Sequence, residues 1–178
     1  MGAGARKVAV IGSMVLVAAL FRLLPHPPNV APVVGLSLLS GASLGPSLAG
    51  FAVPVVAMLI SDAALELLTG HGFHPQMPVV YGTLLLVVVM GRALRSRRRL
   101  LPVATLSLAG STVFYLTTNL AVWAGGTMYP HTLPGLLACY VAALPFFGLS
   151  ILGDLAFSLL LFGTYAFLER RYAALAAS

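Results

Sequence analysis

Long apolar runs, separated by short polar or proline-containing segments, follow one another along most of the chain. The runs cover residues 8–24, 30–44, 47–68, 77–94, 101–124, 133–147 and 148–168. A helix needs ~20 apolar residues to cross a bilayer, with ~17 near the minimum. Unbroken stretches such as 79–90 lack the alternation of transmembrane β-strands. The pattern predicts an all-α integral membrane protein with a single transmembrane domain over residues 1–178.

The composition supports the same class of protein. Of the 178 residues, 60% are hydrophobic and only 8% are charged, whereas a soluble domain needs far more polar surface. The single cysteine, Cys139, rules out an internal disulfide, and packing is its simplest role. The first apolar run has basic flanks like those of a signal peptide. It continues into Arg22 and Pro25 without a clear cleavage site, so we expect it to be a mature span.

The positions of the basic residues predict the topology. Nearly all of them flank apolar runs, which is the positive-inside pattern and not a nucleic-acid-binding stripe. If 30–44 crosses the membrane and 133–147 does not, every basic cluster falls on one side, and only Arg22 lies near the outer end of a span. We therefore expect a bundle of six transmembrane helices, a short re-entrant or interfacial helix at 133–147, and cytoplasmic termini.

Most of the polar side chains then gather at the outer end. The outer loops are 25–29, 69–76 and 125–132, and they contain all four histidines. Acids within a membrane span are costly and usually face a cavity. The candidate substrate-binding residues are His26, Asn29, Asp62, Glu66, His71, His74, Asn119, Trp123, Tyr129, His131 and Asp154.

Simpler roles remain open for several of these residues. Asp62 and Glu66 lie four positions apart on one helix face and would also reach the water of the headgroup region. Asp154 would also serve as the partner of Arg22 in a structural ion pair. The aromatic residues Trp123 and Tyr129 also suit the membrane interface.

A metal site is a further possibility at the outer end. His71, His74 and His131 are the candidate ligands, and Asp62 and Glu66 have suitable ligand chemistry for a divalent metal. Their spacing matches no zinc-protease pattern. The chain has no nucleophile elbow, no phosphate-binding loop and no HExxH motif, so we do not expect an enzyme.

Small residues recur at a spacing of four in the first run, at Ala5, Ala9 and Ser13. Small residues at this spacing allow helices to approach closely. The ladder predicts either packing against a neighbouring span of the same chain or docking of a partner membrane subunit.

Several segments carry a resemblance to a known family. They are RLLPHPPNVAPV at 22–33, TNLAVW at 118–123, YPHTLPGL at 129–136, ACYVAALPFF at 138–147 and LGDL at 152–155. They resemble a family of small, functionally uncharacterised bacterial membrane proteins described as transport proteins. That family is similar to the S components of energy-coupling-factor (ECF) transporters. The resemblance implies a six-helix, S-component-like bundle in the bacterial inner membrane that takes up vitamins or metal ions from outside. It also implies docking through the first helix onto an ECF-type transmembrane subunit with ATPases.

Solitary cobalamin transporters of the same fold are similar to this chain at two further positions. Asp62 and Tyr81 match the acid and the tyrosine that lie near the cobalt. The segment that holds the cobalt-binding cysteine reads His74-Pro75-Gln76 here, so a histidine nitrogen would take the place of the thiolate. The resemblance thus adds Tyr81 to the candidate site and suggests a divalent metal or a metal-containing ligand such as a cobalamin.

Together these observations predict a membrane transport protein that binds a small solute from the outer side. Two other classes remain open. One is a membrane metalloenzyme with an outward-facing His/Asp/Glu site, and the other is a structural membrane subunit without a ligand.

Overall fold

The computed structural model describes residues 3–27, 29–45, 47–96 and 98–171. Its elements, all of them helical, are α1 (Ala3–Leu20), η1 (Phe21–Leu23), α2 (Val33–Leu44), α3 (Leu48–Thr69), α4 (Met77–Gly91), η2 (Arg92–Leu94), α5 (Leu100–Gly125) and α6 (Leu133–Arg171). The described residues contain no β-strand, which confirms the all-α prediction. Arg97 of the predicted basic cluster and Pro28 of the first outer loop lie outside the described residues.

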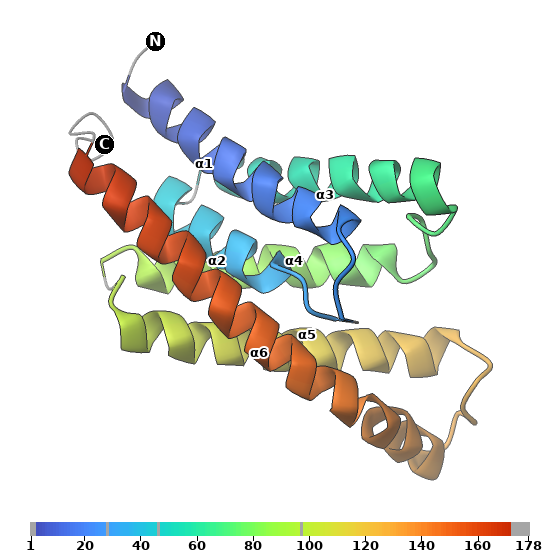
Figure 1. Cartoon of the computed structure of the whole chain (residues 1–178). Helices are drawn as coiled ribbons and strands as arrows, with labels where there is room; N and C mark the ends of the chain where they lie inside the picture. The colour runs from blue at the N-terminus through green and yellow to red at the C-terminus, as the bar shows by residue number, and fades with distance from the viewer. Residues whose placement is uncertain (1–2, 28, 46, 97, 172–178) are drawn as a thin grey trace.

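The helices run back and forth between two ends of a bundle (Figure 1). One end holds the start of α1, the end of α6 and the α2–α3 and α4–α5 connections, and we call it the basic end. The other three connections lie toward the opposite end, which we call the histidine end. Five helices are long and apolar enough to cross a membrane, by length and composition: Gly4–Leu23, Leu48–Thr69, Met77–Leu94, Leu100–Gly125 and Leu133–Arg171. The chain is therefore compatible with a multi-pass membrane protein.

Local signals in the sequence begin and end these helices. Ser47 caps the start of α3, where its hydroxyl accepts a hydrogen bond from the Gly50 amide at 3.3 Å. Gly70 ends the same helix with a φ of 69°, and its amide donates to the Glu66 carbonyl. A proline in the first turn of α4, Pro78, suits a position where no backbone donor is needed.

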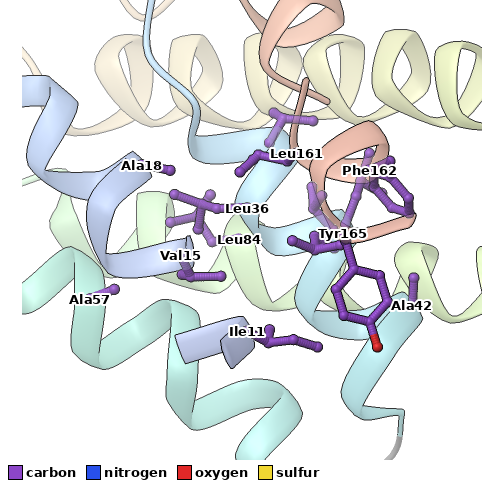
Figure 2. Packing of buried hydrophobic residues seen from close by; sticks show 14 of the residues in the cluster. Ile11, Val15, Ala18, Leu36, Ala42, Ala57, Leu84, Leu161, Phe162 and Tyr165 are labelled. Carbon is purple, nitrogen blue, oxygen red and sulfur yellow. The ribbon is translucent and has the colours of Figure 1, made fainter. Parts of the chain in front are cut away.

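The core surrounds α2, which contacts all of the other α-helices. Ten of its 12 residues are buried. Apolar side chains from α1, α3, α4 and α6 meet those of α2 in one cluster, shown in Figure 2. The cluster includes Ile11, Val15, Leu36, Leu84 and Phe162.

Glycines on α2 and α4 allow these two helices to touch through their backbones. A Cβ at Gly41 would overlap the carbonyl group of Val88, and a Cβ at Gly91 would overlap that of Leu38. Close contact of this kind is common between helices in membranes, where van der Waals packing drives association. The small residues of the second apolar run thus serve to bury α2, which with 12 residues is shorter than the other α-helices.

The prediction of a separate short helix at 133–147 is wrong. That segment forms the first part of α6, which continues for 39 residues to Arg171. Pro145 lies inside the helix and does not end it. A proline removes one backbone hydrogen bond and bends the helix, and Figure 1 shows the first turns of α6 running in a different direction from the rest. The described residues thus form five long apolar helices and the short buried α2, and the segment expected as an extra helix is part of α6.

Candidate functional site

A cavity of about 500 Å³ lies toward the histidine end of the bundle. Its volume is in the range of small-molecule sites. Before the start of α5 it is lined by Arg22, His26, Asn29, Ala31, Val33, Met58, His74, Gln76 and Val80. These residues come from η1, from the α1–α2 and α3–α4 connections, and from α2, α3 and α4.

Two facing helices provide the rest of the wall. The lining residues of α5 are Ser111, Phe114, Tyr115, Thr118, Asn119 and Val122. Those of α6 are Ala143, Phe146, Phe147, Ser150 and Asp154. In both helices they recur every three or four positions, so each set forms one face. The two faces combine aromatic rings with hydroxyl, amide and carboxylate groups.

Arg22 and Asp62 form a buried ion pair beside the cavity. The Arg22 Nη1 lies 2.5 Å from Asp62 Oδ1, and it also donates to the Ser61 hydroxyl at 2.7 Å. The Tyr81 hydroxyl donates to the other oxygen of Asp62. Arg22 reaches the cavity wall, whereas Asp62 and Tyr81 lie behind it. The three side chains hold η1, α3 and α4 together at this end of the bundle.

Asp154 lies apart from that pair. It is 4% exposed and lines the cavity. The Ser111 hydroxyl donates to its Oδ2 at 2.7 Å, and this bond joins α5 to α6. Arg22 pairs with Asp62, so the alternative that Asp154 pairs with Arg22 is wrong.

An aromatic pair forms another part of the wall. The rings of Tyr115 and Phe147 stack with their centroids 4.3 Å apart and their planes at 24°. The Tyr115 hydroxyl donates to the Tyr140 carbonyl at 2.6 Å, which fixes the orientation of its ring. The pair presents an apolar, planar surface to anything held in the cavity.

The structure brings part of the predicted site together. The residues that line the cavity are His26, Asn29, His74, Asn119 and Asp154. The predicted residues outside the lining are Asp62, Glu66, His71, Tyr81, Trp123, Tyr129 and His131. Of these, Asp62 and Tyr81 act on the cavity through Arg22, as described above.

The other outlying residues have local structural contacts. The Glu66 carboxylate accepts hydrogen bonds from the amides of Gly72 and Phe73, at 2.9 and 3.1 Å, and so shapes the α3–α4 connection. The Trp123 Nε1 donates to the Pro130 carbonyl at 2.9 Å, and its ring packs edge-on against His131. These contacts organise the connections around the cavity without entering it.

The predicted three-histidine metal site is not assembled. The described residues contain no group of three or more His, Cys, Asp or Glu side chains that would hold a metal ion. His71 Nδ1 lies 2.6 Å from the Thr69 carbonyl of its own connection, and His131 lies 3.2 Å from the Gly126 carbonyl of another. Of the three, His74 lines the cavity. His71 shares the α3–α4 connection with it but lies against Thr69, and His131 belongs to the α5–α6 connection.

Several lining residues were missing from the predicted site. Ser111, Tyr115, Thr118, Phe147 and Ser150 all lie within long apolar helices. Their only signal in the sequence is their spacing of three or four residues, which places them on the same helix faces as Asn119 and Asp154.

The small-residue ladder of α1 lies on an exposed face. Ala5, Ala9 and Ser13 are all exposed, and the Ser13 hydroxyl bonds back to the Ala9 carbonyl at 2.8 Å. Packing of this ladder against another helix of the same chain is therefore not observed. The face is free for lipid or for another protein.

The chain belongs to a family of unknown function, DUF6580, whose model matches residues 3–175. No curated protein and no solved structure matches it. The family has no assigned activity, so a functional proposal must come from the cavity and its wall.

Proposed function

We propose that this member of DUF6580 is a membrane transport protein that binds a small polar solute in the cavity at the histidine end. The observation that carries the proposal is the cavity itself. It holds about 500 Å³ inside a bundle of otherwise apolar helices, and its wall includes two ionisable residues, the partly buried Arg22 and the buried Asp154. Ionisable side chains inside a membrane span are expensive and mark pathways for solutes or ions.

The positions of the arginines support one orientation of the protein in the membrane. The arginines Arg92, Arg95, Arg98, Arg99, Arg170 and Arg171 lie around the basic end. Under the positive-inside rule that end faces the cytoplasm, so the cavity takes its solute from the outer side. In a bacterium this membrane is the inner membrane. The chain carries no phosphate-binding loop, so the energy for transport comes from a partner subunit or from an ion gradient.

The exposed ladder of α1 supports an S-component-like mode of action. Ala5, Ala9 and Ser13 give α1 a narrow outward face that another membrane helix can approach closely. We propose this face as the contact with an ECF-type transmembrane subunit. The cavity and the ladder are separate features, and a solitary transporter would need only the first.

Filling the cavity tests the proposal. Ser150 lines it, and the neighbouring residue Leu149 does not. We expect the purified wild-type protein to carry a co-purified small molecule, detected by native mass spectrometry, and Ser150→Phe to lose it. The control, Leu149→Phe, introduces the same ring outside the cavity lining and should retain the molecule. Wild-type protein that releases no small molecule and shows no saturable uptake in proteoliposomes would reject the proposal and favour a ligand-free structural subunit.

A further inference from the structure

The charges around the cavity do not balance. Two carboxylates, Asp62 and Asp154, are 3% and 4% exposed; Asp154 lines the cavity directly, whereas Asp62 lies behind the cavity-lining cation Arg22. Arg22 is already paired with Asp62 at 2.5 Å, and Tyr81 occupies the second oxygen of that carboxylate. The pair is neutral as a unit, which leaves Asp154 as the acidic side chain of the cavity wall.

Asp154 lacks a cationic partner within the described chain. Its carboxylate accepts hydrogen bonds from two neutral donors, the Ser111 hydroxyl and the Val34 backbone amide, and no described arginine or histidine nitrogen lies within 4.0 Å of it. A buried carboxylate is costly unless a positive group compensates it. Since this carboxylate lines the cavity, the space beside it is where a compensating positive group would sit.

The rest of the wall indicates which kind of cation fits. On α6, Ser150 and Phe147 share the face of Asp154, and Phe147 lies ~10 Å along the helix from it at ~1.5 Å per residue. Phe147 stacks on Tyr115 of α5 at 4.3 Å. Aromatic faces attract organic cations and accept planar apolar groups. A metal ion fits less well, because the described residues do not bring three strong ligands together.

We propose that the solute is an organic monocation, an ammonium or protonated amine on a planar or aromatic body. Its nitrogen pairs with Asp154, and its body lies along the α6 face toward Tyr115 and Phe147. This inference rests on the proposed function, because it names the chemical class that the same cavity takes. An anionic solute would meet the uncompensated charge of Asp154, and a neutral one would leave that charge unpaired.

Three probes of matched shape test the charge preference: 4-phenylbutylamine, 4-phenylbutanol and 4-phenylbutyrate. Each is added to the purified full-length protein in the same detergent, and the thermal unfolding midpoint is measured. We expect the amine to raise the Tm of the wild-type protein, and the alcohol and the carboxylate to leave it unchanged. Asp154→Asn should lose the response to the amine. The control Glu66→Gln, which changes a carboxylate outside the cavity lining, should keep it.

A second measurement separates ligand binding from a structural role of Asp154. Without any probe, Asp154→Asn should melt at the same or a higher temperature than wild type, because the substitution removes an uncompensated buried charge. If that variant does not fold, Ser150→Phe replaces it, since this change fills the space beside the carboxylate and keeps its charge. Ser150→Phe must also abolish the shift with the amine.

The outcomes distinguish this inference from the proposed function. An equal Tm shift with the alcohol or the carboxylate, or a response to the amine that survives Asp154→Asn, overturns the monocation and leaves solute binding intact. The monocation is also overturned if no probe binds while the wild-type protein carries a molecule that Ser150→Phe loses. The absence of both a probe response and a co-purified molecule rejects the two proposals together.

Discussion

The ion pair between Arg22 and Asp62 gives the sharpest stability prediction. It joins η1 to α3 at 2.5 Å, and Asp62 is 3% exposed. Removing one partner of a buried pair costs about 3–5 kcal/mol, because the other charge stays buried without compensation. Replacing both partners by apolar side chains of similar size is often neutral. The single and double substitutions should therefore differ strongly.

The structure sets the size of each effect. In Arg22→Met the Asp62 carboxylate keeps only the hydrogen bond from Tyr81. The Arg22 side chain is 18% exposed and lines the cavity, so water replaces part of the lost interaction. We expect a loss of about 2–4 kcal/mol in the free energy of unfolding. Asp62→Leu leaves Arg22 with the Ser61 hydroxyl and the cavity, and a loss of about 1–3 kcal/mol is expected.

The double variant Arg22→Met/Asp62→Leu should lie within about 1 kcal/mol of wild type. The assay is equilibrium unfolding of the detergent-purified protein, followed by circular dichroism and by the fluorescence of its single tryptophan, Trp123. A double variant that is as unstable as the sum of the two singles would refute the reasoning, because it would mean that the two charges do not interact. Tyr81→Phe is a useful companion, with an expected loss of about 0.5–1.5 kcal/mol for one hydrogen bond.

Three further predictions concern backbone contacts and exposed faces. Gly41→Ala places a methyl group against the Val88 carbonyl and should lower the free energy of unfolding by about 1–3 kcal/mol. At Gly82 an added methyl group meets nothing within 4 Å, so Gly82→Ala should raise the free energy of unfolding by about 0.5–1 kcal/mol. Thermal unfolding of both variants checks these opposite signs. Pro145→Ala restores a backbone donor inside α6 and should straighten it, which spin-label distances between the two parts of that helix would detect. Ala9→Leu lies on the exposed face of α1 and should change the stability by less than about 0.5 kcal/mol in thermal unfolding, so any loss of uptake would point to a partner.

The sequence predicts the long helices well. The runs at 47–68 and 101–124 agree with α3 and α5 to within one residue at each end. Length, apolarity and the capping signals at Ser47 and Gly70 are enough for this. The prediction failed at 133–147 because this short run was separated from the last span so that Arg170 and Arg171 fell on the same side as the other basic residues, whereas α6 is continuous through both runs. Helices in membranes tolerate an internal proline more readily than those of soluble proteins.

The candidate site was harder to predict because the outer faces of these helices suit lipid and not water. A helix of a soluble protein has a polar outer face, and that face fixes its rotation in the fold. Here α4, α5 and α6 lack a polar outer face, so the sequence does not say which residues face inward. This is why Tyr115 and Phe147 were missed, and why the partner of Arg22 was left open between substrate and Asp154. The partner of Arg22 is fixed only by a contact between segments 40 residues apart in the sequence, the pair of Arg22 with Asp62.

The short length of α2 explains where the cavity lies. This helix has 12 residues, ~18 Å at ~1.5 Å per residue, so it ends well short of its longer neighbours. The connection from α1 therefore descends into the bundle before α2 begins, as Figure 1 shows, and Ala31 and Val33 at its inner end line the cavity. The longer helices α5 and α6 continue past this point and enclose the space that α2 does not fill. Asp154 lines that space from α6, so the same short, small-residue helix that packs the core also leaves room for a solute beside a buried charge.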